Sequence, residues 1–527
     1  MNFKTKFKKN KGITLIALVV TIIVLLILAG ISITMLTGQN GILNRAGEAK
    51  TTNGVAQGVE LIKVSVMDAL TRGTGELTDE NLRKALSSNL GTEGKDYEIV
   101  GSEDCGWTVT IKGNDKDYKI SSTGKIGEIE KVEGSKSDWE IEGNAVVKYL
   151  GNDKDIVIPN YVDGTKITEI GEKIFNDSEK TGTLTISEGI KTIDTYAFAD
   201  SKFTGELILP NTIKTIRSYA FAGCNGFTGN LELPSSVETI ENFSFVAWNG
   251  NTNDLIIPGS IKKIEDYAFC SCNGFKGKLT IKDGVQEIGR DAFIQSTGFN
   301  TLELGNTIKS IGQEAFLGCT GFTGELKIPN SVEIIEGYAF RACNGFTGEL
   351  KIPNSLKKIG GNAFENCTGF TGDLIIPEAL EEVGFSAFAG CTGIKGDLII
   401  SDNVTIEDLS SFADINFSGL IYIGKNVQGM NIGHSVSSKR VIMNSLIRDY
   451  ATMQYFPNIE SCWISSDIIK DIETIKMFTY EDTIKNKNMV IYTDATEDDE
   501  NWPKDWNPNT LKVVYETSLD KYYELTD

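Results

Sequence analysis

The sequence predicts an α+β protein whose larger part is a solenoid of about eleven coils, each 23–24 residues long. Two observations predict the solenoid: a phenylalanine recurs at this interval through the middle of the chain, and a leucine stands fourteen residues before almost every one of them. A third observation concerns the N-terminal part of the chain. There, a long apolar run and several short strand-like segments predict a membrane-spanning helix followed by a small antiparallel sheet.

The N-terminal segment has the two parts of a membrane anchor. Residues 1–12 form a basic leader with five lysines and no acidic residue. Residues 13–33 are uncharged, and a helix of this length spans roughly 31 Å, the hydrocarbon thickness of a bilayer. Lysine-rich flanks stay on the cytoplasmic side, so the sequence predicts one membrane span with the rest of the chain outside the cell.

The junction KGITLIALVV between leader and span resembles the type IV prepilin family. In that family a basic leader is removed after a glycine and the new N-terminal residue is methylated. The resemblance implies cleavage between Gly12 and Ile13, with methylation of Ile13. Ala17 stands where the family has a glutamate, so a minor pilin-like component and a plain membrane anchor are both open alternatives.

Residues 34–132 are expected to form a pilin-like helix and a small sheet. Four apolar residues recur at helical spacing and predict one buried helix face: Val55, Val59, Ile62 and Val66. A second helix is expected over residues 78–87 with Thr78 as its N-cap. Four segments with strand-like composition follow, DYEIVG, GWTVTIKG, DYKISS and GKIGEIE.

Residues 156–423 carry the repeat, after a linker and N-terminal cap over residues 133–155. The ladder phenylalanines, at intervals of 23 or 24 residues, are Phe175, Phe198, Phe221, Phe245, Phe269, Phe293, Phe316, Phe340, Phe364, Phe388 and Phe412. In the unit LKIPNSVEIIEGYAFRACNGFTGE, the leucine and the residue two positions later point to one face of a short strand, which proline then ends. One coil cannot bury its apolar face alone, so stacked coils are expected to share a continuous core.

The motifs IPxSV, I..IG..AF and C.G resemble those of the bacterial surface leucine-rich-repeat family called BspA-like, over about residues 139–423. The resemblance implies a leucine-rich-repeat solenoid on the bacterial cell surface, with a role in binding or adhesion. The segment VIYTDATEDDENWPKDWNPNTLKVVY resembles that family's closing segment. Residues 424–527, where the period is lost, are therefore expected to form a C-terminal cap region.

Six cysteines each lie three residues after a ladder phenylalanine: Cys224, Cys272, Cys319, Cys343, Cys367 and Cys391. A chain of disulfides, a metal-binding column and a stack of small buried thiols are three interpretations of this spacing. The stack is favoured because free cysteine packs like a small apolar residue and no CxxC pair is present in the sequence.

Two further features supply candidate binding residues. Asp373 and Asp397 stand just before the strand leucines of neighbouring coils, where they form either a solvated ladder or a site for a cation or basic ligand. In one divergent unit Trp248 replaces the cysteine, and three asparagines follow it: Asn249, Asn251 and Asn253. A large aromatic side chain beside such a loop is a candidate contact with glycan or protein, and sequence drift in a tolerant turn is the alternative.

Composition excludes several classes of function. The single histidine, His434, leaves no Ser-His-Asp, Cys-His or multi-histidine zinc arrangement, and no phosphate-binding loop or dinucleotide motif occurs. No enzyme activity, metal or cofactor is therefore predicted. A formal net charge of −21 disfavours nucleic acid as a partner.

The predicted function is that of a membrane-tethered extracellular protein for surface binding or adhesion, with an unidentified protein or glycan as ligand. The alternative is a minor pilin-like structural component of a type IV filament or secretion machine, with pilus-like subunits as its partners.

Overall fold

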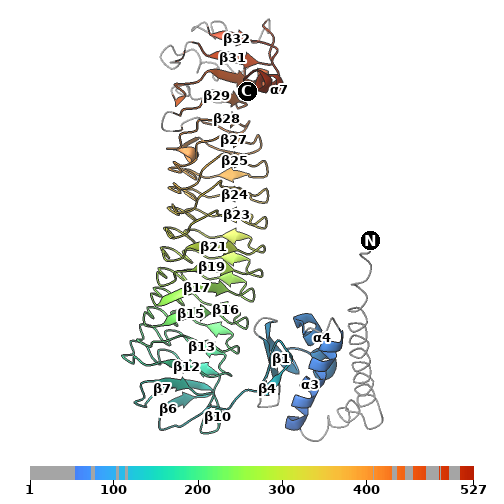
Figure 1. The fold of residues 1–527 in the computed structure, drawn as a ribbon, viewed down its shortest axis with the longest axis vertical. Coiled ribbons are helices and arrows are strands. Elements are labelled where there is room, and N and C mark those ends of the chain that lie inside the picture. Colours follow the sequence, from blue (N-terminus) through green and yellow to red (C-terminus); the bar gives the residue numbers. More distant parts are fainter. Residues whose placement is uncertain are drawn as a thin grey trace, which may run out of the picture. The chain divides into compact units, whose positions relative to one another are not determined.

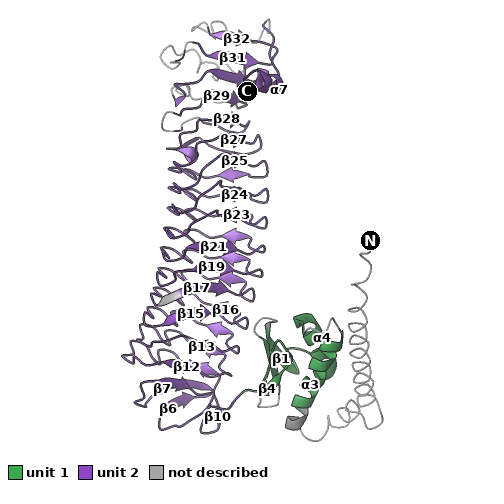
Figure 2. Ribbon diagram, viewed as in Figure 1, with its two compact units in different colours: residues 1–129 green, residues 130–527 purple. Residues whose placement is uncertain are grey.

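The computed structural model describes residues 54–526 apart from the gaps 73–76, 103–105, 113–116, 408, 430–431, 433–435, 446–454, 470–485, 487 and 498–510. The leader and the predicted membrane span, residues 1–33, lie outside the described residues. None of the helices within the described residues is both long enough and apolar enough to cross a bilayer. The chain divides into two compact units, residues 1–129 and 130–527 (Figure 2).

The first unit contains two helices and a four-stranded antiparallel sheet. Its elements are α3 (Gly54–Arg72), α4 (Asp79–Leu90), β1 (Tyr97–Ser102), β2 (Gly106–Ile111), β3 (Asp117–Ile120) and β4 (Ile126–Glu128), with the strands paired in sequence order. Ile62 and Val66 on α3 are buried together with Trp107 of β2. The Thr78 hydroxyl caps α4 by accepting a hydrogen bond from the Asn81 amide at 3.2 Å. The cap, the four strands and the helix-face residues Ile62 and Val66 are thus confirmed among the described residues, Val59 is partly buried, and the side chain of Val55 lies outside the described residues.

The second unit is a solenoid of about 14 turns (Figure 1). It opens with a hairpin of β6 (Trp139–Glu142) and β7 (Ala145–Tyr149), which covers the first coil, beside the short strands β5 (Glu133–Gly134), β9 (Tyr161–Val162) and β10 (Thr165–Lys166). Trp139 is buried at this end of the core.

Most coils contribute a short parallel strand to one side, called the strand face, and residues 207–209, 326–328 and 350–352 take the same place in their coils without forming a strand. The strands are β8 (Ile156–Ile158), β12 (Leu184–Ile186), β15 (Thr228–Glu232), β17 (Asn251–Ile257), β19 (Lys278–Ile281), β21 (Thr301–Leu304), β25 (Leu374–Ile376), β27 (Leu398–Ile400), β28 (Leu420–Ile423), β29 (Arg440–Met443), β30 (Ser461–Ile464), β31 (Val490–Thr493) and β32 (Lys512–Val514). Parallel pairing joins coil to coil at the normal strand spacing.

The returning arm of each coil between residues 169 and 383 contains a two-residue strand. These are β11 (Glu169–Ile170), β13 (Thr192–Ile193), β14 (Thr215–Ile216), β16 (Thr239–Ile240), β18 (Lys263–Ile264), β20 (Glu287–Ile288), β22 (Ser310–Ile311), β23 (Ile334–Ile335), β24 (Lys358–Ile359) and β26 (Glu382–Val383). The ladder phenylalanine follows this strand. In every coil from Phe175 to Phe388, the residues two positions before and two positions after it have positive φ.

The ladder phenylalanines form a continuous stack in the core. Phe198 to Phe412 are fully buried, and neighbouring rings lie nearly parallel with centroids 5.1–5.7 Å apart. The strand leucines and arm isoleucines pack around them in one cluster that runs from Trp139 to Leu511.

Stacking continues beyond residue 423, where the fixed period ends. Strands β29–β32 add further turns, so the solenoid is longer than the eleven coils predicted. A short helix, α5 (Ser466–Ile469), lies in this part, and a 3-10 turn (Leu409–Phe412) lies just before it. The last helix, α7 (Leu519–Thr526), packs on the outward side of β29–β31 through Tyr522, which contacts Ile442 and Trp463.

Candidate functional site

The strand face presents one outward side chain per coil, at the position between the two buried residues of each strand. In β8, β12 and β25 the burial pattern is buried, exposed, buried. The outward residues, called the strand-face row, are Val157, Thr185, Ile208, Glu232, Ile256, Thr280, Glu303, Lys327, Lys351, Ile375 and Ile399. Three of the apolar members are strongly exposed: Ile208 by 68%, Val157 by 49% and Ile375 by 49%.

Charged members of this row pair across coils. Lys351 lies 3.8 Å from Glu325, and Lys278 forms an ion pair with Glu303. These residues are well exposed, and such ion pairs contribute about 0–1 kcal/mol to stability. The row is therefore not a structural requirement of the coil.

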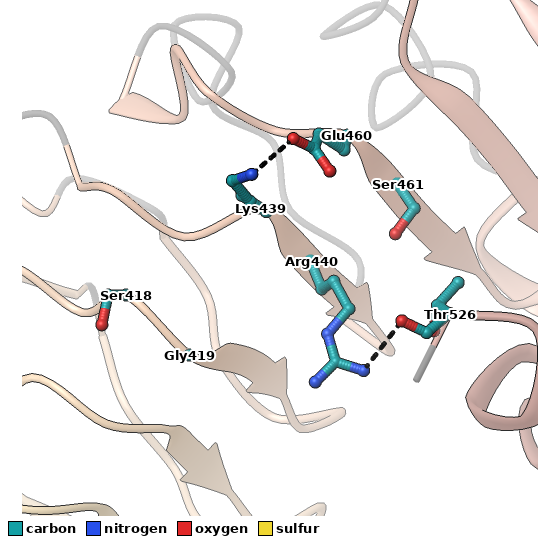
Figure 3. A pocket seen from close by; sticks show the side chains of 7 residues that line it. All are labelled: Ser418, Gly419, Lys439, Arg440, Glu460, Ser461 and Thr526. Atoms are coloured by element: carbon teal, nitrogen blue, oxygen red, sulfur yellow. Dashed lines mark hydrogen bonds and ion pairs between the residues drawn. The ribbon is translucent and has the colours of Figure 1, made fainter.

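A polar hollow of about 450 Å³ lies at the C-terminal end of the solenoid, where α7 ends (Figure 3). Lys439 pairs with Glu460 at 2.7 Å, and Arg440 donates to the Thr526 carbonyl at 3.5 Å. Ser461 on its wall shares a hydrogen bond with the Tyr522 hydroxyl. Because its polar groups hold helix and sheet together, the hollow is part of the cap.

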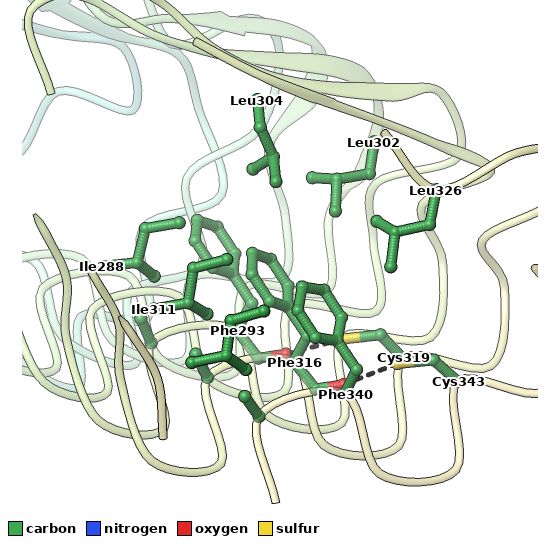
Figure 4. Close-up of a cluster of buried hydrophobic side chains, with 14 of the residues drawn as sticks. Ile288, Phe293, Leu302, Leu304, Ile311, Phe316, Cys319, Leu326, Phe340 and Cys343 are labelled. Atoms are coloured by element: carbon green, nitrogen blue, oxygen red, sulfur yellow. Dashed lines mark hydrogen bonds between the residues drawn. The ribbon is translucent and has the colours of Figure 1, made fainter. Parts of the chain in front are cut away.

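The cysteine column lies in the core beside the ladder phenylalanines (Figure 4). Cys319 and Cys343 each donate from Sγ to the carbonyl of a ladder phenylalanine, Phe293 and Phe316 respectively, at 3.0 Å. The same bond recurs at Cys224, Cys272, Cys367 and Cys391. Ser296, which stands at the equivalent position, makes it at 2.7 Å.

The described cysteines are free thiols, and no group of three metal-binding side chains occurs among the described residues. Burial raises the pKa of Cys319 to about 12, so the thiol stays protonated and unreactive at neutral pH. The column is thus a set of small core groups that satisfy one backbone carbonyl per coil.

Trp248 lies in the core, which corrects the expectation that its ring contacts a ligand. It is fully buried and stacks on Phe227 with ring centroids 5.3 Å apart and planes 4° apart. Elsewhere a small cysteine and a turn phenylalanine fill this space. Here the indole fills both places, and Asn251, which replaces the turn phenylalanine, begins strand β17. The indole N–H has no acceptor among the described residues.

Asn249 is exposed and ties successive coils together. Its amide donates to the side-chain oxygen of Asn225 at 3.0 Å, and its own side-chain oxygen accepts from the Asn273 amide at 3.1 Å. The side chain of Asn253 is exposed, and the Asn253 backbone carbonyl accepts from the Gly277 amide at 2.9 Å. The recurrence of asparagine at one position in three successive units is the sequence signal for this ladder.

Asp373 and Asp397 make the same kind of tie. One carboxylate oxygen of Asp373 accepts from the Asp397 amide at 2.8 Å, and one of Asp397 accepts from the Leu420 amide at 2.7 Å. The two carboxylates are partly buried and each is engaged with the backbone of the next coil. Among the described residues, no third metal-binding side chain joins the two aspartates to complete a cation site.

A row of surface aromatic residues was not identified from the sequence. Tyr196, Tyr219, Phe243 and Tyr267, called the tyrosine strip, each lie two positions before a ladder phenylalanine in four successive coils. They are partly exposed, and their rings stack in parallel. The sequence signal for them is their fixed place two positions before the ladder phenylalanine.

Comparison with known proteins identifies the repeat. The BspA type leucine rich repeat region matches in four overlapping segments, residues 148–276, 191–323, 245–367 and 322–432. No curated protein matches the chain.

Several solved structures are similar. A leucine-rich repeat protein from Bacteroides ovatus is 20% identical over 66% of this chain and 95% of its own, with a TM-score of 0.41. A leucine rich cell surface protein from Faecalibacterium prausnitzii is 16% identical over 77% of this chain and 95% of its own, with a TM-score of 0.33. The pneumococcal vaccine antigen PcpA is 14% identical over 79% of this chain and 100% of its own, with a TM-score of 0.30. Since residues 148–432 make up more than half of the chain, the protein belongs to the BspA-type leucine-rich repeat family.

Proposed function

We propose that the protein is a non-catalytic surface protein whose solenoid binds a protein or glycan ligand outside the bacterial cell. The observation that carries this proposal is the strand-face row. Its apolar members, such as Ile208, are exposed although the core nearby is closed, and nothing in the coil geometry requires them there. Apolar surface that is contiguous across coils, such as Ile375 beside Ile399, is typical of interaction sites.

The division of side chains within a coil supports the same function. Cysteines, asparagines and aspartates that resemble site residues in the sequence are occupied by coil-to-coil hydrogen bonds. Outward residues change from isoleucine to glutamate to lysine between coils while the inward residues keep their type. A fixed frame with variable outward residues suits recognition, as in other solenoid proteins.

A binding screen tests the function. Residues 130–527, which form a compact unit with its own core, are fixed to a surface and exposed to extracellular matrix proteins and to glycans. We expect selective binding of at least one class. Uniform lack of binding would contradict the proposal. Ile208→Ser and Ile375→Ser change exposed side chains only, so they are expected to leave folding intact and to weaken any ligand that sits on the strand face.

Tethering to the membrane through residues 13–33 is a second part of the proposal. It is supported by the length and lack of charge of this segment and by the lysines that precede it. Proteolysis of intact cells is the test. Digestion of the repeat region from outside, with a membrane-bound fragment left behind, is expected, and full release of the intact chain by a salt wash contradicts it.

A role as a minor pilin-like component is the alternative function. Two features favour it: the sequence around Gly12 and Ile13, and the helix α3 that precedes a four-stranded antiparallel sheet in the first unit. Mass spectrometry of the mature N-terminus decides whether the leader is processed. A chain that begins at methylated Ile13 supports this alternative, whereas a chain that retains Met1 and the leader argues against it.

A further inference from the structure

The tyrosine strip is a regular array of aromatic edges along the solenoid. Successive ring centroids from Tyr196 to Tyr267 are 4.7, 4.7 and 4.6 Å apart, and the ring planes differ by 5–10°. Lys173 lies over the outer face of the array at Tyr196, with its ammonium 5.6 Å from the ring centroid. At the other end, the neighbouring carboxylate of Asp291 and burial raise the pKa of Tyr267.

The backbone at these positions does not favour aromatic residues. Tyr196, Tyr219, Phe243 and Tyr267 have φ of 56°, 59°, 62° and 60°, in the left-handed region that bulky side chains rarely adopt. Other coils use Asp291, Asn362 and Ser386 at the same position with the same φ. The coil therefore requires the left-handed backbone at this position but not an aromatic ring, and aromatic side chains are among those that this conformation disfavours.

The chemistry of the strip indicates what it can bind. Tyr219 and Phe243 have a neighbouring ring against each face, and Tyr196 lies between Lys173 and Tyr219, so these rings offer mainly their edges and the tyrosine hydroxyls to a ligand. The hydroxyls of Tyr196 and Tyr219 have no hydrogen-bond partner among the described residues. The residues that directly precede the strip are polar: Thr195, Ser218, Asn242 and Asp266. Two of them are tied to neighbouring coils, because Ser218 donates to Glu241 and Asp266 accepts from the Arg290 amide, each at 2.9 Å.

A ligand that uses this array must repeat along the solenoid at nearly the spacing of the coils. An extended polypeptide advances by about 3.3 Å per residue, with like-facing side chains at twice that distance, and falls out of register within a few coils. A β-linked hexose chain advances by close to one coil per sugar and offers hydroxyls at every step. The carboxylates of Glu241, Glu265 and Asp266 beside the strip, and the net charge of −21, oppose a polyanion or a second copy of this chain.

We propose that the tyrosine strip binds an unbranched, uncharged β-linked glycan that lies along the solenoid with one sugar per coil. This proposal rests on the proposed binding function and names one ligand class and one surface for it. The strip differs from the strand-face row, so the two surfaces can be tested separately.

Titration calorimetry of the full-length protein with β-1,4-linked glucose and N-acetylglucosamine oligomers of two to six units tests the proposal, with maltohexaose as the α-linked control. Affinity for at least one β-linked series is expected to rise with length up to four sugars, one for each ring, and to level off beyond that. Maltohexaose is expected to bind at least 10-fold more weakly than the best β-linked hexamer.

Two variants identify the surface. Replacing the four strip residues with asparagine, the residue at position 362, is expected to reduce affinity at least 10-fold while circular dichroism stays unchanged. Tyr196→Phe with Tyr219→Phe keeps the ring stack and removes the free hydroxyls, so it reports on hydrogen bonding even where the first variant is destabilised. Tyr338→Asn is the matched control, because Tyr338 occupies the same coil position under Arg341, outside the strip.

Absence of binding to every β-linked hexamer overturns the proposal, as does equal binding by the wild type and both strip variants. If the screen of matrix proteins and glycans nevertheless finds another ligand, the binding function stands and only the assignment to the tyrosine strip falls.

Discussion

Removal of one ladder phenylalanine tests whether the ring stack holds the solenoid together. Phe316 is fully buried, and its ring lies between those of Phe293 and Phe340 with centroid distances of 5.3 and 5.1 Å. Phe316→Ala removes a benzyl group from a closed core and leaves a cavity that its neighbours fill only in part. From comparable core substitutions, the expected loss is about 3–5 kcal/mol of unfolding free energy.

Phe385→Ala is the matched control, since it is the same chemical change in the same array. Phe385 is 69% exposed, so its removal is expected to alter stability by less than about 0.5 kcal/mol. Guanidinium unfolding of residues 130–527, followed by circular dichroism, measures both variants. Hydrogen exchange then shows whether protection is lost mainly in the coils adjacent to Phe316, as nearest-neighbour stacking requires. Equal stability of the two variants, or a loss below about 1 kcal/mol for Phe316→Ala, would refute the ladder as the main stabilising feature.

Three further predictions concern side chains that the sequence offered as site residues or that join neighbouring coils. Cys270 is the one described cysteine that is not buried, so maleimide should label it in the native protein, as peptide mapping would show. Buried thiols such as Cys343, whose pKa is raised well above its usual value by burial, should be spared. Labelling of Cys343 in the folded protein would contradict the closed core. Cys343→Ser should be nearly neutral for stability, because a hydroxyl can make the same bond to the Phe316 carbonyl of an earlier coil. Cys343→Val should lower the unfolding free energy by about 1–3 kcal/mol, because it leaves that carbonyl unsatisfied. Equal melting temperatures for the two variants would contradict this role of the thiol. Burial alone would raise the pKa of Asp194, but hydrogen bonds from the Thr195 amide and the Arg217 guanidinium lower it overall. The ionised carboxylate therefore stabilises the fold at neutral pH, and this contribution is lost as the pH falls below the ordinary value of 3.8. The difference in unfolding free energy between wild type and Asp194→Asn should shrink on acidification, and a difference that grows would contradict the sign of the shift.

The repeat region could be predicted from the sequence because each coil position recurs about ten times. A phenylalanine or leucine that returns at one interval must occupy one place in a stack, and no tertiary information is needed to see it. The family assignment and solenoid fold were confirmed for this reason. The turns after residue 423 were missed because the interval there becomes irregular, although strands such as β29 and β30 still pair in register.

The candidate site residues were harder to interpret, because one sequence does not show which polar atoms face a backbone group. Asp373 has the same carboxylate whether it binds a cation or accepts the next coil's amide, and only coordinates distinguish the two. Trp248 is instructive because its burial follows from volume: one indole replaces the cysteine and the turn phenylalanine of other coils. The sequence signal for its burial is that the same unit lacks both the cysteine and the turn phenylalanine.

The tyrosine strip shows how this fold separates stability from recognition. Each coil requires a left-handed residue two positions before its ladder phenylalanine, but the side chain there points outside the core and is not fixed by packing. Asn362 and Tyr219 have the same left-handed backbone conformation, but the first places a polar amide at the surface and the second an aromatic ring. Rows of such positions can therefore change over several coils without disturbing the phenylalanine stack, and each row runs along the solenoid at the coil spacing. A ligand with a matching repeat gains one contact per coil, so its affinity depends on how many consecutive coils carry the right residue.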